Sequence, residues 1–143
     1  MKLASSAFQE GASIPNEFTC DGQDISPPLR ISDVPKGAKS LALIMDDPDA
    51  PVGTFVHWVA WNMPPTTTEI QKDHAVGMQG TTGFGKQGYG GPCPPSGRHR
   101  YFFKLYALDT ELNLPAETGK NGLEKAFKGH ILAQAQLIGT YQR

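Results

Sequence analysis

Two stretches in the middle of the chain predict adjacent strands that are buried on both faces. Residues 40–47, SLALIMDD, form an almost continuous apolar run of strand length, which is typical of a central strand covered on both sides. Residues 55–63, FVHWVAWNM, predict the next strand, and strict alternation places His57 and Trp61 on one face and Trp58 on the other. Because both faces carry large apolar groups, this strand is also expected to be internal.

The C-terminal half predicts two more strands and one helix. Residues 99–109 alternate between two faces along a strand, and residues 130–141, HILAQAQLIGTY, alternate in part and predict a closing strand. Residues 121–129 predict the one helix of the chain, with Asn121 as its cap, Glu124 at the capping-box position and a glycine at its end.

The remaining segments are rich in turns and contain only short extended pieces. Residues 29–31 alternate and predict a short strand, whereas residues 66–90 form a long polar excursion with one short strand near 75–78. The 143 residues include 16 Gly and 12 Pro spread between the apolar runs, which indicates many turns and a mainly β fold. A chain of this length is expected to form a single domain that spans residues 1–143.

Charge and hydropathy argue against nucleic-acid-binding and membrane-spanning classes. The formal net charge is −1 and the pI is near 6.4, so the basic surface expected of a nucleic-acid-binding protein is missing. A membrane span needs about 18 consecutive apolar residues, and no such run is present. The N-terminal stretch MKLASSAFQEGASIP lacks an apolar core long enough for a signal peptide, which favours a cytoplasmic location.

The cysteine pattern leaves two states open. Cys20 and Cys93 lie far apart in the sequence and have no CxxC spacing, which argues against zinc-ribbon and thioredoxin-like sites. Free thiols are the favoured state for a cytoplasmic chain. The alternative is a single long-range disulfide, which would attach the N-terminal segment to the central loop.

Polar side chains at strand ends and beside proline-rich corners form the candidate site. Asp47 ends the first buried strand, and His57 lies early in the next. A loop rich in Gly and Pro then leads to His99 and Tyr101 at the start of another strand. Imidazole and phenol groups donate hydrogen bonds to an oxyanion, and the backbone N–H groups of residues 90–91 could form an anion-binding nest. With Asp47 fixing the tautomer of an imidazole, these groups predict a small anion pocket.

Each candidate residue also has an ordinary structural explanation. A strand-end aspartate commonly caps a turn, and a histidine in an apolar strand is commonly a hydrogen-bonded core residue. The two arginines beside His99 are not expected to touch a ligand. Alternation points Arg98 and Arg100 away from His99, so we expect them to form ion pairs or to brace the corner at residues 47–51.

Two catalytic alternatives compete with a binding role. His57, His99 and Asp47 could form a metal site of two histidines and one carboxylate, although no HxD or HxxxH spacing supports it. Ser96 or Cys93 could act as the nucleophile of a hydrolase, but no GxSxG elbow is present. We therefore expect a non-enzymatic protein that needs no metal ion and no cofactor.

Two separated motifs carry a family resemblance that covers nearly the whole chain. They are DPDAP at residues 47–51 followed by His57-Trp58, and GP at residues 91–92 followed by GRHRY at residues 97–101. TCDG at residues 19–22, ISP at residues 25–27 and GHIL at residues 129–132 agree with the same pattern. The chain resembles the phosphatidylethanolamine-binding proteins, which include the Raf-kinase-inhibitor proteins, and is most similar to their short bacterial and archaeal branch of the YbhB/YbcL type.

The resemblance implies a fold, a site and a mode of action. The fold would be all-β, with a large antiparallel sheet packed on a smaller one and little helix. The implied pocket for phosphate, acetate or a phospholipid headgroup would be lined by Asp47, His57, Gly91, Pro92, His99 and Tyr101. Members of the family act by binding, and some inhibit kinases or serine proteases. The expected partners are therefore a small anionic ligand and a kinase or protease, with the chain itself a monomer or homodimer.

Overall fold

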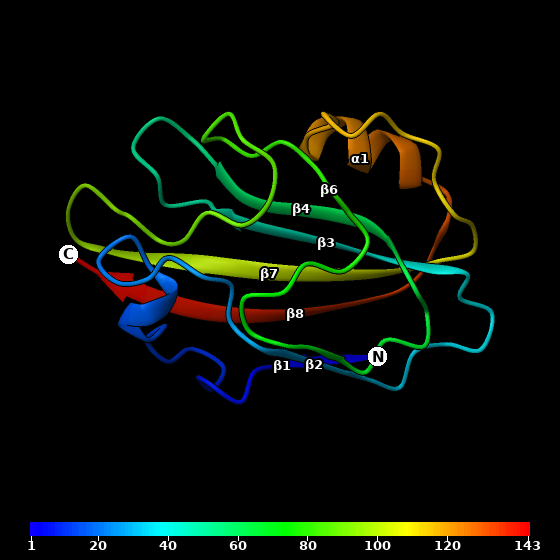
Figure 1. Ribbon diagram of the computed structural model, residues 1–143, viewed down its shortest axis with the longest axis horizontal. Coiled ribbons are helices and arrows are strands. Elements are labelled where there is room, and N and C mark those ends of the chain that lie inside the picture. The colour runs from blue at the N-terminus through cyan, green and yellow to red at the C-terminus, as the bar shows by residue number, and fades with distance from the viewer.

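Residues 1–143 of the computed structural model form two antiparallel sheets and a single α-helix (Figure 1). The smaller sheet contains, in order, β1 (Lys2–Ala4), β2 (Leu29–Ser32) and β5 (Glu69–Ile70). The larger sheet contains, in order, β6 (Met78–Gln79), β4 (Phe55–Met63), β3 (Ser40–Asp47), β7 (Arg98–Leu108) and β8 (Ile131–Gln142). A 3-10 turn, η1 (Asn16–Phe18), precedes β2, and α1 (Lys120–Phe127) lies between β7 and β8. The predicted all-β class, with a large sheet and a smaller one, is confirmed.

The strand β3 lies at the centre of the larger sheet, and all of its residues are buried. It pairs with β4 on one side and with β7 on the other. The predicted bounds of the two buried strands, 40–47 and 55–63, agree with the structure. Alternate residues of β3 face different hydrophobic clusters, which explains why the sequence of this strand is apolar without interruption.

The strand β4 departs from strict alternation near its start. Trp58 pairs with Met45 of β3, and the next register pair skips one residue of β4. That extra residue is His57, which lies in a β-bulge. The ring of His57 contacts Tyr101, which belongs to the same cluster as Trp58, whereas Trp61 belongs to the opposite cluster. The prediction that His57 and Trp61 share a face is therefore wrong, because the bulge turns His57 to the other side.

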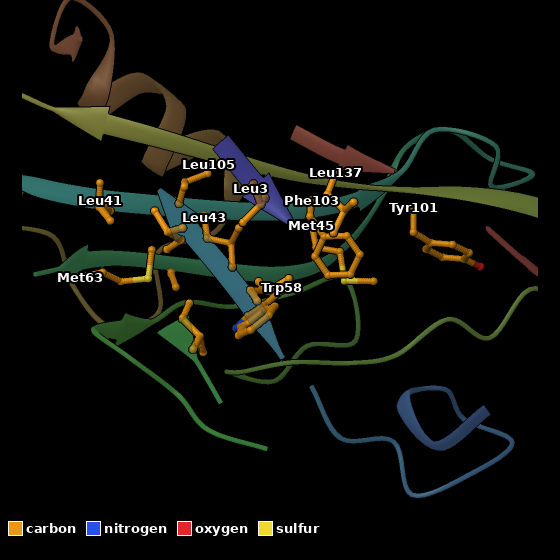
Figure 2. Close-up of a cluster of buried hydrophobic side chains, with 14 of the residues drawn as sticks. Leu3, Leu41, Leu43, Met45, Trp58, Met63, Tyr101, Phe103, Leu105 and Leu137 are labelled. Carbon is orange, nitrogen blue, oxygen red and sulfur yellow. The ribbon is translucent and has the colours of Figure 1, made fainter. Parts of the chain in front are cut away.

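Two hydrophobic clusters occupy the two faces of the larger sheet. The cluster that joins the two sheets contains 18 buried residues, among them Trp58, Phe103 and Leu137, which Figure 2 shows. The second cluster contains 9 buried residues and lies beneath α1, which contributes Leu123 and Phe127. Both faces of the sheet are thus covered, by a second sheet and by a helix.

The helix α1 begins differently from the prediction and ends as predicted. Gly119, not Asn121, is its N-cap, and no side chain caps its first turn, so the predicted capping box is wrong. The first turn is attached to β3 instead, because Nζ of Lys120 lies 2.9 Å from the buried carboxylate of Asp46. Gly129 follows the C-cap with φ +84, a backbone angle that favours glycine and ends the helix.

The long connection at residues 66–90 returns to the edge of the larger sheet. Its regular strands are β5 and β6, and the short strand expected near 75–78 begins at the end of that range. Backbone N–H groups of Gly83 and Gly90 donate to the carbonyl groups of Val56 and His57, at 2.8 and 2.9 Å. The end of the connection therefore lies beside the start of β4. No helix of the chain is long and apolar enough to cross a membrane.

Candidate functional site

A cavity of about 200 Å³ lies where β3 ends and where β4 and β7 begin. Four polar residues predicted from the sequence line it, namely Asp47, His57, His99 and Tyr101. The other lining residues are Ala50, Pro51, Val52, Phe55, Phe84, Cys93, Pro94 and Pro95. The polar groups come from three adjacent strands, whereas most of the apolar ones come from loops. The strand pairing thus assembles a polar set, and the loops surround it with apolar side chains.

Asp47 and His99 form a buried pair across the cavity. Nδ1 of His99 lies 2.7 Å from Oδ2 of Asp47, and both side chains are less than 10% exposed. The other carboxylate oxygen, Oδ1, accepts the backbone N–H of Asp49 at 2.8 Å. Both oxygens of Asp47 are therefore engaged, and the contact keeps a proton on Nδ1 of His99. This is the tautomer-fixing arrangement expected from the sequence, and it leaves Nε2 of His99 for other partners.

His57 is a buried histidine surrounded by aromatic rings. Its Nδ1 donates to the carbonyl oxygen of Gly90 at 2.7 Å, which leaves Nε2 without the proton when the ring is neutral. Its ring makes edge contacts with Phe55, Phe84 and Tyr101 at centroid distances of 5.2, 5.3 and 5.2 Å. Burial lowers the pKa of His57 below its usual 6.5, and the Gly90 carbonyl and the charge of Asp47 oppose that shift without cancelling it.

Tyr101 supplies an unpaired donor. Its side chain is buried, and its hydroxyl group has no hydrogen-bond partner within the protein. Figure 2 shows its hydroxyl oxygen directed away from the labelled core side chains. Burial, followed by the charge of Asp47, raises the pKa of Tyr101 well above its usual value, so the hydroxyl stays protonated and can donate. A buried unpaired hydroxyl that lines a cavity is the feature expected where a ligand atom binds.

The backbone N–H groups of residues 90–91 are not free to form the predicted nest. The N–H of Gly90 donates to His57, and the N–H of Gly91 donates to Oδ1 of Asp24 at 2.8 Å, so neither is free for a nest. Gly91 and Pro92 do not line the cavity. A Cβ at Gly91 would meet the carbonyl oxygen of Phe18, so glycine is required there by packing. The N–H groups of residues 90–91 therefore have partners within the chain, and a role for Gly91 and Pro92 in binding the anion stays a prediction.

The cysteines also differ from the favoured prediction. Cys20 and Cys93 form a disulfide with a Cα–Cα distance of 5.4 Å, which is the alternative that the sequence left open. The N–H of Cys20 also donates to the carbonyl of Pro92 at 3.1 Å, and Tyr89 donates its hydroxyl to the carbonyl of Phe18 at 2.6 Å. The segment around η1 is thus fastened to the loop that forms one wall of the cavity, and Cys93 has no thiol to act as a nucleophile.

The two arginines of β7 have different partners. Arg100 donates from its backbone N–H and its guanidinium to the carboxylate of Asp49, with three contacts of 2.9 Å. These hydrogen bonds with Arg100 lower the pKa of Asp49 from 3.8 to about 2. Arg98 donates to the hydroxyl of Thr140 at 3.1 Å and makes no ion pair. The expectation that an arginine braces the corner at residues 47–51 is confirmed for Arg100 alone.

The metal-site alternative lacks a suitable ligand set. No three His, Cys, Asp or Glu side chains are arranged to hold a metal ion together. Nδ1 of His57 is bonded to a carbonyl group, and Nδ1 of His99 is bonded to Asp47. These contacts leave Nε2 of both rings open, but Asp47, His57 and His99 do not form a group arranged to hold a metal ion.

Sequence relatives cover almost the whole chain. Residues 4–142 match the family model described as phosphatidylethanolamine-binding protein. A UPF0098 protein of Aquifex aeolicus is 50% identical over an alignment covering 100% of this chain and 89% of the relative. A UPF0098 protein of Methanothermobacter thermautotrophicus is 49% identical over an alignment covering 100% of this chain and 99% of the relative.

Solved structures share the complete fold. A homologue of the phosphatidylethanolamine-binding proteins from Chlamydia trachomatis superposes with a TM-score of 0.97 at 42% identity, covering 99% of this chain and 97% of its own. YbcL of Escherichia coli, described as a member of the mammalian family, superposes with a TM-score of 0.92 at 29% identity, covering 99% of this chain and 98% of its own. Both sheets and the helix therefore belong to a recurrent architecture.

The first prediction concerns the corner that carries Asp47. Replacing Arg100 with Ala removes the hydrogen bonds that stabilise the ionised Asp49, so the pKa of Asp49 should rise from about 2 towards 3.8. An NMR titration of the carboxyl resonance measures the shift. Arg98→Ala is the matched control, because Arg98 does not contact Asp49, and a shift of equal size in that variant would contradict the assignment.

The second prediction concerns the disulfide. The bond joins residues that are 73 positions apart, and cross-links over long loops typically stabilise a domain by about 2–4 kcal/mol. The double variant Cys20→Ser/Cys93→Ser should lose a free energy of unfolding of that order in a urea titration. A thiol assay in denaturant without reductant should find no free thiol in the oxidised wild type, and two free thiols per chain would refute the bond.

Proposed function

The chain belongs to the phosphatidylethanolamine-binding protein family, and from this membership we propose that it is a non-catalytic binding protein. Its ligand is a small anionic group, a phosphate or a carboxylate, held in the cavity formed by Asp47, His57, His99 and Tyr101. The observation that carries the proposal is the hydroxyl of Tyr101, which is buried, protonated and unpaired beside two imidazoles.

Three groups at the base of the cavity can bind such an anion. Tyr101 donates its hydroxyl, and His99, whose Nδ1 is bonded to Asp47, donates from Nε2 when its ring carries both protons. His57 accepts at Nε2 when neutral, so it can receive a hydroxyl proton of a monoprotonated phosphate, or it can bind an anion together with a proton. The set therefore suits a ligand with both acceptor oxygens and an exchangeable proton.

The walls limit what the anion can be attached to. Most of the other lining residues are apolar or proline, and Phe84 and Val52 at the cavity are 44% and 99% exposed. Apolar walls favour an anion that carries a hydrocarbon or aromatic substituent over a free inorganic ion. The volume of about 200 Å³ accommodates a headgroup or a single side chain rather than a whole lipid.

The physiological role follows from this ligand class. A headgroup-sized pocket that takes one phosphorylated or carboxylated side chain suits regulation of a protein partner, and a kinase or a serine protease is the partner class that the family suggests. Catalysis as a metal-dependent hydrolase or as a serine or cysteine hydrolase is the weaker candidate. Cys93 is in a disulfide, and the three candidate metal ligands do not form a group arranged to hold a metal ion.

The cellular location is proposed on the sequence alone. A disulfide is more typical of oxidising compartments, with the proteins of hyperthermophiles as the known exception. We keep the cytoplasmic location as the proposal, and the oxidation state of Cys20 and Cys93 in freshly lysed source cells tests it.

The third prediction tests the cavity directly. Tyr101→Phe removes one donor to a charged ligand and should weaken the binding of phenyl phosphate by about 10- to 100-fold in calorimetry, since hydrogen bonds to charged groups contribute about 1.5–3 kcal/mol. Tyr106→Phe is the matched control, because Tyr106 lies in the cluster beneath α1, away from the cavity. Equal binding by Tyr101→Phe and wild type would contradict the proposed site.

The fourth prediction concerns pH. The pKa of His57 is lowered in the free protein, and a bound anion stabilises the imidazolium and raises that pKa, so binding takes up a proton. Sulfate, whose charge is constant near neutrality, should bind more tightly as the pH falls below the usual 6.5 of histidine, by at most about tenfold per pH unit for one proton.

The variant His57→Gln isolates the contribution of this residue to the pH dependence. It should reduce the slope of log affinity against pH, and His130→Gln is the control, because that histidine pairs with Asp109 far from the cavity. If His57→Gln left the slope unchanged, the proton uptake would not occur at His57.

A further inference from the structure

The outer edge of β8 is covered along only part of its length. This strand is the last of the larger sheet, and residues near its C-terminal end bond to the segment that follows β1. Gly11 donates to the carbonyl of Ile138 at 2.7 Å, and Thr140 donates to the carbonyl of Ala12 at 2.9 Å. The N–H of Ile138 donates to the carboxylate of Glu10 at 2.9 Å. Residues 138 and 140 therefore direct their backbone groups away from β7.

Part of the outer edge of β8 has no hydrogen-bond partner for its backbone groups. Gln134 and Gln136 lie an even number of residues before Ile138 on a regularly paired stretch of β8, so their backbone N–H and C=O groups also point away from β7. No other segment of the chain forms hydrogen bonds with these groups. Both residues are exposed. The unpaired stretch is bounded towards the N-terminus of β8 by a register shift at Leu132. Towards the C-terminus it is bounded by the hydrogen bonds that Ile138 forms with the segment after β1. Four backbone groups, from two residues, thus form a short open edge.

This edge lacks the devices that normally prevent edge-to-edge pairing. No charged residue and no proline occurs from Ile131 to Gln142. Ile131 and Leu132, at the start of the strand, are 37% and 45% exposed. Native edge strands are usually protected by lysine, proline or inward-pointing charges, and an uncharged open edge is a template for another strand.

We propose that this edge pairs with the same edge of a second copy of the chain, antiparallel, about a two-fold axis at Ala135. In that register Gln134 lies opposite Gln136 of the second copy, and the two open residues of each chain exchange four backbone hydrogen bonds. The five-stranded sheets of the two copies join into one continuous sheet.

The side chains favour a second copy over an unrelated segment. A glutamine amide both donates and accepts, so Gln134 can bond to Gln136 of the second copy on both sides of the axis. With the axis at Ala135, each residue 134 faces residue 136 of the second copy, and the uncharged glutamines at both positions meet without like-charge repulsion. Ala135 on the axis is small and half-buried, so the two backbones can approach to the ordinary strand spacing.

The pairing leaves the candidate cavity open. Ala135 is opposite Leu105 on β7, whereas Tyr101 of the cavity is opposite Gly139. Four residues of strand separate the two places, a distance of roughly 13 Å. The cavity therefore remains accessible in the dimer, and phenyl phosphate binding reports on correct folding of the variants without depending on dimerisation.

The test uses the full chain and three forms of the edge, analysed by sedimentation equilibrium over a wide concentration range. The wild type should approach twice the chain mass of 15.5 kDa as its concentration rises. Gln134→Glu/Gln136→Glu places like charges on both sides of the axis and should remain monomeric. Gln134→Lys/Gln136→Glu brings opposite charges together across the axis and should restore the dimer.

Three results of the sedimentation experiment would overturn the proposal. They are a wild type that stays monomeric at every concentration, a doubly acidic variant that dimerises as well as the wild type, and a lysine–glutamate variant that stays monomeric. Amide hydrogen exchange gives a second readout. The N–H groups of Gln134 and Gln136 should exchange rapidly in dilute wild type and become protected on dimerisation, whereas the N–H of Ile138 should be protected at both concentrations. Equal exchange of the two glutamine amides at both concentrations would overturn the proposed pairing.

Discussion

The carboxylate of Asp47 connects the elements on which the rest of the site depends. It ends the fully buried strand β3, and its two oxygens accept the N–H of Asp49 and the Nδ1–H of His99. The first contact sets the turn that leaves the strand, and the second joins the end of β3 to the start of β7. Because a buried carboxylate without such partners is costly, the corner and the imidazole stabilise each other. The neighbouring pair of Asp49 and Arg100 fastens the same corner from the outside.

A second constraint is local to β4. The bulge at His57 inserts one residue against β3 and brings that histidine to the face of the sheet that carries Tyr101. A histidine in regular alternation would have lain on the face beneath α1, away from Tyr101. The bulge thus places a titratable ring among aromatic side chains, where burial lowers its pKa. The binding chemistry proposed for the cavity depends on this shift in register as much as on residue identity.

The two ends of the larger sheet have different properties. At the end where β7 begins, loops, a disulfide and hydrogen bonds to the η1 segment enclose a polar set. Towards the other end, the edge of β8 presents unpaired and uncharged backbone. Rigid enclosure suits recognition of a small ligand, because little order has to be gained on binding. An open edge suits association with another strand, because its hydrogen bonds are already aligned. One sheet can therefore support two independent interactions.

The sequence by itself determined the all-β class, the bounds of β3 and β4, the end of α1 and the four polar residues of the cavity. Continuous apolar runs and proline-rich corners are patterns of neighbouring residues, so they predict local structure without knowledge of the tertiary contacts. Only the tertiary structure decided the face on which His57 lies, the partners of the N–H groups of residues 90–91 and the pairing of Cys20 with Cys93. A bulge depends on the partner strand, and a hydrogen bond or a disulfide depends on which distant segment comes within reach. These are properties of distances in space, which spacing along the chain does not encode.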